Sequence, residues 1–419
     1  MQPPNLLTDY DAVGFDADHC LVKYNNVELV KFLVKIEAEE FVELGWPKEM
    51  AEFDYENDLP VCLNATIFDI DNGLVIKLAK GQEVIQAMKG INKKLNKQEI
   101  ESVYGTPPIF KNYQWPNTTH LHQNKGAYWV FLTYFDTPKV AVVLKAIELV
   151  NSGKTSKTYF DIAVDLRTMV YRFYVHYNEK EVHPIATFGK YFSEVIKDPS
   201  RFIQFQPELR DSLDKLRKAG KKVFLGTNSH TEYANLIMTA TLGDDWRSFF
   251  DIICCACRKP LYFWDMKPAP FYVVDPKMPN LKGRAILDAN DLSAEPHQTY
   301  IEGNSKTLTH YFERTMGIYD REVRVAFFGD HYITDAHAAS TNPGWDGIAV
   351  VEELALFDPE LEDGKESQHV ITDKSWGKDA YFADGTRGNL KLNYFIGQVE
   401  DSARYMLPFV RNIDMWMGQ

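Results

Sequence analysis

Two aspartates, Asp16 and Asp18, stand one residue apart at the end of the apolar run Ala12–Phe15. Carboxylates this close raise each other's pKa unless a cation sits between them. Taken alone, such a pair is most often a simple turn, because Asp is common where a strand gives way to a turn. The functional interpretation is that the pair holds a hard divalent cation and acts on an anionic substrate.

Three further apolar runs end in polar residues that could bind phosphate or metal. Short β-rich runs that alternate with helical sequence predict a parallel α/β sheet. Because ligands of such sheets bind beyond the carboxyl ends of the strands, we expect the residues at all four ends to meet in one crevice. The three later ends are Thr227 and Asn228 after the run 223–226, Lys259 after the run 250–256, and Asp330 and Asp335 after the run 323–329.

The residue types in this set suit phosphoryl transfer with Mg²⁺, which prefers a few carboxylates together with water and substrate phosphate. A lysine and a hydroxyl group suit phosphate oxygens, the first as a point charge and the second as a hydrogen-bond donor. One aspartate can attack phosphorus to give an aspartyl-phosphate. A neighbouring carboxylic acid can protonate the leaving alkoxide and later deprotonate water.

In this order the four segments resemble the motifs of the haloacid-dehalogenase superfamily: Asp16-x-Asp18, Thr227, Lys259 and Gly329-Asp330-x₄-Asp335. Within that superfamily the chain is similar to the cytosolic purine 5'-nucleotidase family, and the resemblance covers nearly the whole chain. The strings that carry it are Gly14-Phe15-Asp16-Ala17-Asp18, Thr227-Asn228-Ser229, Arg258-Lys259-Pro260-Leu261 and Gly329-Asp330-His331.

The resemblance implies a role for each motif residue and Mg²⁺ as the cofactor. Asp16 would be the nucleophile and a metal ligand. Asp18 would be the acid/base and would bind the metal through its backbone carbonyl. Asp330 would complete the metal site, and Asp335 would support it. The phosphate group would be held by Thr227, Asn228 and Lys259.

The implied function is a Mg²⁺-dependent, 5'-nucleotidase-like phosphohydrolase that cleaves a phosphate monoester, a nucleoside monophosphate, through an aspartyl-phosphate intermediate. Cys20 departs from the family pattern, which has a threonine at this position. A thiol is a poorer hydrogen-bond donor than a hydroxyl group, so the loop that carries Asp16 would be held less firmly. The alternative hypothesis is a catalytically weak or inactive family member that acts as a metal- or nucleotide-binding regulatory protein.

The spacing of the motifs predicts two domains. Asp16 and Thr227 are 211 positions apart, whereas a parallel crossover needs only about a dozen residues. We therefore expect an α/β fold with a haloacid-dehalogenase-like (Rossmannoid) parallel-sheet core and a large, mainly helical cap inserted between the first and second motifs. The predicted boundaries are 1–25 and 205–419 for the core and 26–204 for the cap.

The cap sequence predicts a helix over 27–44 and a β-hairpin near 65–78, because Asn72-Gly73 is a strong hairpin signal. The stretch 127–204 is expected to be mostly helical. In the core, the stretch 276–297 is rich in proline and polar residues, and we expect a loop insertion there.

The cap should determine which phosphate ester is bound. The stretch 133–138 resembles a family segment whose phenylalanine stacks on a nucleotide base, which makes Phe135 a candidate substrate contact; the alternative is a core aromatic residue. Arg167 resembles a substrate-binding arginine of the purine nucleotidases, and a surface helix arginine is the alternative. Tyr171 stands where an acidic residue is expected, so purine recognition would be altered or absent.

A phosphatase of sugar phosphates or phosphoproteins is a third interpretation, although a large cap would exclude bulky protein substrates.

Composition narrows the classes of partner. The net charge of −13 argues against a nucleic-acid polymer, but not against a small phosphorylated metabolite such as a nucleoside monophosphate, because a lysine and a metal ion can reverse the field in one pocket. No apolar stretch is long enough to span a membrane, and the first ten residues show no secretory signal. The five cysteines then indicate reduced thiols and a cytoplasmic protein. The sequence leaves the oligomeric state open, a homo-oligomer included.

Overall fold

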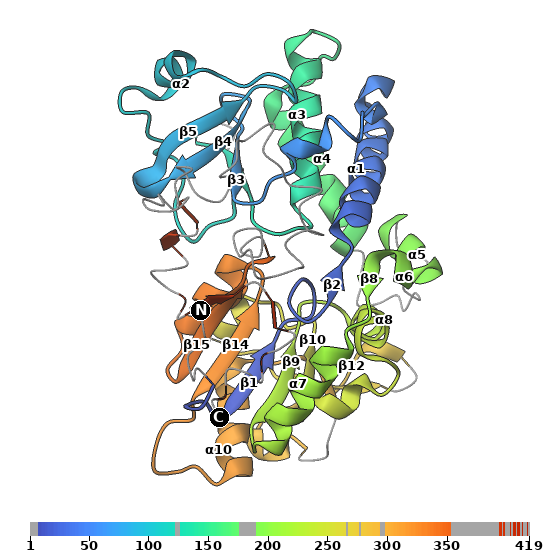
Figure 1. Ribbon diagram of the computed structural model, residues 1–419, viewed down its shortest axis with the longest axis vertical. Coiled ribbons are helices and arrows are strands. Elements are labelled where there is room, and N and C mark those ends of the chain that lie inside the picture. The colour runs from blue at the N-terminus through green and yellow to red at the C-terminus, as the bar shows by residue number, and fades with distance from the viewer. Residues whose placement is uncertain are drawn as a thin grey trace.

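The computed structural model places a large sheet beneath a second group of helices and strands, as Figure 1 shows. Parallel strands with helices on both faces confirm the predicted α/β class. Within the described ranges, no helix combines the length and the apolar character needed to cross a membrane. The described residues are 7–121, 126–175, 190–264, 267–275, 278–293, 298–352 and scattered positions between 394 and 417.

Strand β1 lies near the centre of a nine-stranded sheet with the order β12-β11-β13-β10-β9-β1-β14-β15-β16. Phe15 of β1 pairs with Leu225 of β9 on one side and with Phe328 of β14 on the other, and both neighbours run parallel to β1. All other strands run in this direction except β11, which pairs antiparallel with both β13 and the edge strand β12. The residues that follow β1, β9, β10 and β14 therefore lie at one edge of the sheet. The bounds are β1 Ala12–Phe15, β9 Lys222–Gly226, β10 Ile252–Cys255, β11 Phe271–Asp275, β12 Met278–Ile286, β13 Gln298–Glu302, β14 Val325–Gly329, β15 Trp345–Val350 and β16 Tyr405–Leu407.

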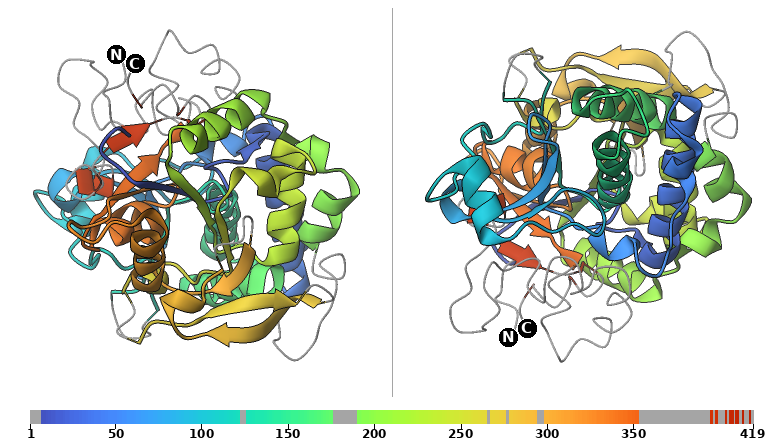
Figure 2. Two further views of the ribbon diagram at one scale, coloured as in Figure 1. Left: turned by 90° about the horizontal axis from the view of Figure 1, so that it is seen from below. Right: turned by 90° about the horizontal axis from the view of Figure 1, so that it is seen from above.

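Helices cover both faces of the sheet (Figure 2), which explains why its central strands are apolar along their whole length. Val13 and Phe15 belong to the core beneath α7 (Pro207–Lys218) and α8 (Thr231–Leu242). Ala12 and Phe224 belong to the opposite core, beneath α10. The other helical segments of this part are α9 Leu261–Trp264, α10 Ser305–Met316, α11 Ala338–Ser340 and a π-helical turn over Tyr332–His337.

The chain between β1 and β9 forms a second sheet with its own helices, which we call the intervening region (residues 26–202). Its sheet has five antiparallel strands in the order β5-β4-β3-β7-β6. Helices α1, α3 and α4 pack against one another beside it. The strand bounds are β3 Thr66–Asp69, β4 Leu74–Ala79, β5 Glu83–Met88, β6 Thr119–His120 and β7 Tyr128–Phe131. The helix bounds are α1 Asn26–Glu43, α2 Lys97–Tyr104, α3 Thr137–Asn151, α4 Tyr159–Val170, α5 Lys190–Lys197 and α6 Pro199–Phe202.

Two short strands, β2 (Lys23–Tyr24) and β8 (Ile203–Gln204), pair where the chain enters and leaves the intervening region. They lie at the boundaries that the sequence predicts between core and cap, although the division into two domains stays a prediction. The hairpin sequence forms β3 and β4, but these strands are part of a larger sheet than the sequence indicated. Helix α1 begins within one residue of the predicted start.

The expectation of a loop over 276–297 was wrong for residues 278–286, which form β12, while 276–277 and 294–297 lie outside the described residues. Met278–Ile286 pairs antiparallel with β11 at the edge of the large sheet. An edge strand tolerates proline and polar residues, since one side of its backbone needs no partner within the sheet. Similarly, the stretch 127–204 opens with strand β7 before its helices begin.

Candidate active site

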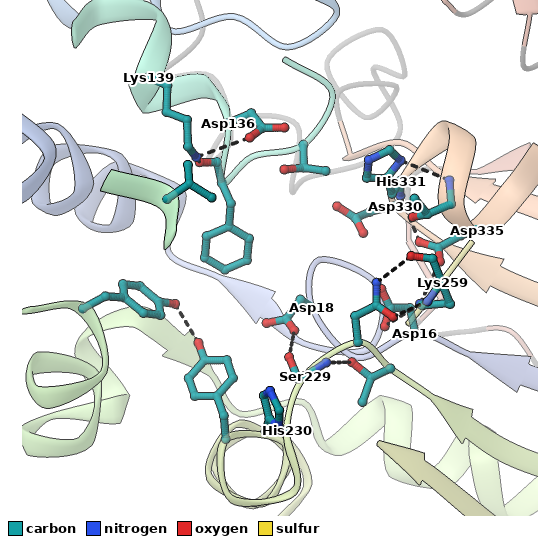
Figure 3. Close-up of a pocket in the computed structure, with 18 of the residues that line it drawn as sticks. Asp16, Asp18, Asp136, Lys139, Ser229, His230, Lys259, Asp330, His331 and Asp335 are labelled. Carbon is teal, nitrogen blue, oxygen red and sulfur yellow. Dashed lines mark hydrogen bonds and ion pairs between the residues drawn. The ribbon is translucent and has the colours of Figure 1, made fainter. Parts of the chain in front are cut away.

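The predicted strand-end residues line one cavity of about 340 Å³. Asp16 directly follows β1, Thr227 follows β9, and Asp330 follows β14, so the parallel register alone brings them together. Lys259 arrives from the loop after β10, and Asp335 from the π-helical turn. Figure 3 shows Asp16 and Asp335 paired with Lys259, Asp330 near them, and Asp18 farther from the lysine, beside Ser229.

Three carboxylates form a compact cluster that could hold a metal ion. Asp16, Asp330 and Asp335 each offer an oxygen, and these atoms all lie within 4.8 Å of one another. Lys259 Nζ lies 3.0 Å from Asp16 Oδ1 and 2.7 Å from Asp335 Oδ1. Only a glycine fits at position 329, because a Cβ atom there would lie 2.4 Å from the Cβ of Asp335. The close approach of strand and turn thus depends on Gly329.

Burial shapes the protonation of this cluster. Burial raises the pKa of Asp16, and Lys259 offsets this in part while Asp335 adds to it. Burial together with Asp16 and Asp335 holds the pKa of Asp330 well above its ordinary value. Burial alone would lower the pKa of Lys259, but the two carboxylates beside it raise that pKa instead. The lysine therefore stays charged, and the carboxylates around it are short of positive charge, which a divalent cation would supply.

Asp18 lies beside this cluster in a different environment. Its Oδ1 accepts a hydrogen bond of 2.6 Å from the Tyr24 hydroxyl, and its Oδ2 accepts one of 2.6 Å from the Ser229 hydroxyl. Burial, with Asp16 adding, raises the pKa of Asp18 to about 6, although these two hydrogen bonds partly oppose the shift. A carboxyl group with a pKa near neutrality can both give and take a proton, as a general acid/base must.

The loops after β9 and β10 are tied together by an amide side chain. Asn228 donates from Nδ2 to the Lys259 carbonyl at 3.1 Å, and its Oδ1 accepts from the Lys259 backbone N–H at 2.6 Å. This pair of bonds fixes the backbone of Lys259, so the amide of Asn228 positions the lysine rather than pointing freely into the cavity. Thr227 is buried, and its Oγ1 accepts from the Ser229 backbone N–H.

His331 has a structural role next to Asp330. Its Nδ1 accepts hydrogen bonds from the backbone N–H groups of Ile333 and Thr334, both at 3.2 Å. Burial lowers the pKa of His331 to about 4, so the ring is neutral and free to accept. The ring thereby caps the turn that carries Asp335.

Cys20 retains an anchor for the Asp16 loop. Its Sγ donates to the carbonyl oxygen of Phe328 at 3.4 Å, and the backbone N–H of Asp16 donates to the same oxygen at 2.8 Å. The thiol is buried, and burial raises its pKa well above the ordinary value. The position expected to carry a threonine therefore still ties the loop to β14, through a weaker donor.

The opposite wall of the cavity comes from the intervening region, and half of its lining residues are aromatic. Phe135 lies there, with its ring edge-on to those of His19, Tyr24 and Tyr191 at 4.9–5.9 Å. The other lining residues from this region are Trp129, Thr133, Asp136, Lys139, Val170, Tyr191 and Phe192. Arg167, in contrast, is exposed on α4 and does not line the cavity. The structure thus brings Phe135 to the site and leaves Arg167 outside it.

Sequence reasoning missed a buried ion-pair network that includes two residues of this wall. Lys139 Nζ lies 3.3 Å from Asp136 Oδ1 and 3.7 Å from Glu37 Oε1, and it donates to the carbonyl of Phe135. Figure 3 shows Asp136 and Lys139 across the cavity from Lys259. Glu37 belongs to α1 and Lys139 to α3, two helices about one hundred residues apart in the chain. The positions carry no motif, so only the packing of α1 on α3 reveals the contact.

The comparisons with known proteins agree with this geometry. The sequence model of the 5' nucleotidase family matches residues 6–376. The chain belongs to that family. Human 5'-nucleotidase domain-containing protein 1 is 27% identical over 347 residues, covering 82% of this chain and 72% of the human protein. The protein of the same name from Bos taurus is 27% identical over 394 residues, covering 90% of this chain and 82% of its own length. A 5'-nucleotidase domain-containing protein of Dictyostelium discoideum is 25% identical over 360 residues, 84% of this chain and 54% of that protein.

Proposed function

We propose that this 5' nucleotidase family member is a Mg²⁺-dependent phosphohydrolase that cleaves nucleoside monophosphates. The observation that carries the proposal is the cluster of Asp16, Asp330 and Asp335 around Lys259, with Asp18 beside it at the same edge of the sheet. Family membership supports a phosphoric monoester as the substrate class. The cavity size falls in the range typical of small-molecule sites.

The donor set fits Mg²⁺. Hard carboxylate oxygens are the ligands that this ion prefers, and the three carboxylates are compact, buried and only partly neutralised by the lysine. Asp16 and Asp330 would hold the ion, Asp18 would add its backbone carbonyl, and Asp335 would support the site. When bound, the ion would neutralise charge on the phosphate oxygens and orient the group.

The side chains of this chain can then carry the two chemical steps. In the first, an oxygen of Asp16 attacks phosphorus, the bond from phosphorus to the leaving oxygen breaks, and Asp18 gives its proton to that oxygen. In the second, a water molecule attacks the aspartyl-phosphate and gives its proton to Asp18, which releases phosphate and restores Asp16. Lys259 and the Thr227 hydroxyl hold the phosphate oxygens during both steps, and Asn228 holds the lysine backbone.

We further propose that residues 1–25 and 205–419 act as a haloacid-dehalogenase-like core and residues 26–204 as its cap. Supporting this, the strand ends supply the polar floor of the cavity, whereas Trp129, Phe135 and Phe192 supply an aromatic wall suited to a flat base. The aromatic rings support a nucleotide as the substrate, because a flat base can stack on them.

Phosphate release from a panel of nucleoside monophosphates and from 4-nitrophenyl phosphate, with Mg²⁺ or with EDTA, tests the proposal. We expect Mg²⁺-dependent release that Asp16→Asn abolishes and that Asp214→Asn, a surface control paired with Lys218, leaves unchanged. Absence of Mg²⁺-dependent turnover across the panel would refute the enzymatic function. Stabilisation by Mg²⁺ alone, seen without turnover, would favour the regulatory binding protein instead.

A further inference from the structure

Three tyrosine hydroxyl groups form a continuous hydrogen-bonded chain that ends on Asp18. The Tyr24 hydroxyl donates to Asp18 Oδ1 at 2.6 Å and lies 3.1 Å from the Tyr233 hydroxyl. The Tyr233 hydroxyl in turn lies 2.6 Å from that of Tyr191. All three residues are buried, with at most 5% of their surface exposed. The chain reaches Asp18 at Oδ1, whereas Ser229 bonds to Oδ2, and both Tyr233 and Tyr191 line the cavity.

Chemistry at the Asp18 end gives the chain a direction. Tyr24 donates its single hydrogen to Asp18 Oδ1, and it must do so whenever Asp18 is ionised, because a carboxylate can only accept hydrogen bonds. In its bond with Tyr233, the Tyr24 hydroxyl must then be the acceptor, so Tyr233 is the donor. The Tyr233 hydroxyl has thereby used its hydrogen, so in its bond with Tyr191 it accepts and Tyr191 donates. All three hydrogens therefore point toward the carboxylate, and each bond polarises and strengthens the next.

The three tyrosines come from three separate elements. Tyr24 ends β2, Tyr233 lies on α8, and Tyr191 lies on α5 of the intervening region. Edge-on ring contacts of Phe135 with Tyr24 and Tyr191, at 5.6 and 5.9 Å, join the chain to the aromatic wall of the cavity. The orientation of Asp18 thus depends on how α5 of the intervening region is docked against α8 of the core.

We propose that Tyr24, Tyr233 and Tyr191 are positioning residues that hold the Asp18 carboxyl group where it can protonate the leaving oxygen. Two donors fix the rotation of this carboxyl group: Ser229 from the loop after β9, and Tyr24, which is itself fixed by the other two hydroxyls. One lone pair on each Asp18 oxygen is then occupied, and the remaining ones stay available to the substrate. This inference rests on the proposed function, because it assigns the chain to the acid step of that reaction.

A purely structural role for the tyrosines predicts a different outcome. Rings that only pack would, when altered, disturb all substrates equally. A positioning role affects only the step that needs a proton, so the loss depends on the leaving group. Phenyl phosphate releases a strongly basic phenoxide and needs the acid, whereas 4-nitrophenyl phosphate releases a stable anion and hardly needs it.

The experiment compares kcat/KM for these two esters in wild type, Tyr191→Phe and Tyr24→Phe, all with Mg²⁺. Each substitution keeps the ring and removes only the hydroxyl group. Since general acid catalysis contributes about 10²–10⁴-fold, we expect Tyr191→Phe to lose about fivefold and Tyr24→Phe about thirtyfold on phenyl phosphate, with less than about twofold on 4-nitrophenyl phosphate. Tyr113→Phe is the matched control, because Tyr113 is buried away from the cavity and its hydroxyl has no hydrogen-bond partner among the described residues.

Equal losses on both esters, or no loss on either, would overturn the inference while leaving the proposed function intact. A wild-type protein without turnover on any ester would overturn both. If Tyr191→Phe does not fold, as judged by circular dichroism, Tyr233→Phe is measured in the same way, because it interrupts the chain at its middle bond.

Discussion

Glu37 is a carboxyl group that the fold should keep protonated at neutral pH. The residue is fully buried on α1, and neither of its carboxyl oxygens has a hydrogen-bond partner among the described residues. Lys139 Nζ is 3.7 Å away, too far for a hydrogen bond, and it is shared with Asp136. Burial therefore outweighs the attraction of the lysine and raises the pKa of Glu37 from 4.5 to about 8.

The sign of the effect on stability follows from where protons are bound. Between pH 4.5 and pH 8 the folded protein keeps the Glu37 proton while the unfolded chain has released it, so the free energy of unfolding falls as the pH rises. Each pKa unit is worth about 1.36 kcal/mol, which gives a loss of about 3 kcal/mol between about pH 5.5 and pH 8 from this group alone. Glu37→Gln removes the titrating group, so the variant should gain about that much over wild type across the same interval.

Urea unfolding of both proteins at several pH values measures this difference directly, because subtraction cancels the other titrating groups. The same substitution in a Lys139→Met background is the control. Without the lysine, Glu37 should stay neutral to a higher pH, and the advantage of the glutamine should keep growing above pH 8. A difference that is constant with pH would refute the reasoning. A glutamine variant that loses stability at high pH would show instead that Glu37 is ionised and stabilised by Lys139.

Two further predictions concern the core motifs. Cys20→Thr replaces a weak donor to the Phe328 carbonyl with a hydroxyl group, so we expect a gain of about 0.5–1 kcal/mol in stability and an equal or higher kcat; a lower kcat in phosphate-release assays would contradict it. Lys259→Met leaves Asp16 and Asp335 without their buried cation, so in EDTA we expect a loss of about 3–5 kcal/mol in stability, partly restored by Mg²⁺. Melting curves with and without Mg²⁺ check this, and an equal loss in both conditions would contradict it.

The core of the site was predictable because the end of each strand can be recognised in the local sequence, and a parallel sheet then brings those strand ends together. Each of Asp16, Thr227 and Asp330 directly follows an apolar run, and parallel strands in register place their ends together. No knowledge of the helices is needed for that inference. Lys259 was harder to place, since it lies four residues beyond β10 and is aimed at the cluster by its bonds with Asn228.

Residues brought together only by packing could not be predicted. Glu37 and Lys139 meet because α1 lies on α3, and Tyr24, Tyr191 and Tyr233 meet because α5 lies on α8. Nothing in the local sequence separates these side chains from ordinary core residues. Arg167 is the opposite case: its stretch of sequence resembles a substrate-binding segment, but on α4 its side chain is exposed. In both cases the missing information is which face of a helix another element covers.

The structure also changes how the Cys20 substitution bears on activity. The sequence pattern suggested a loosened Asp16 loop, which puts full catalytic rate in doubt and motivates the alternative of a catalytically weak or inactive protein. The loop is instead held at the Phe328 carbonyl by two donors, the Cys20 thiol and the Asp16 backbone N–H, and the stronger of these does not depend on the side chain at position 20. Asp18, two residues before Cys20 in the sequence, takes its orientation from Tyr24 and Ser229. The substitution therefore weakens one of several anchors, which favours an enzyme with a modestly altered rate over a protein that has lost its chemistry.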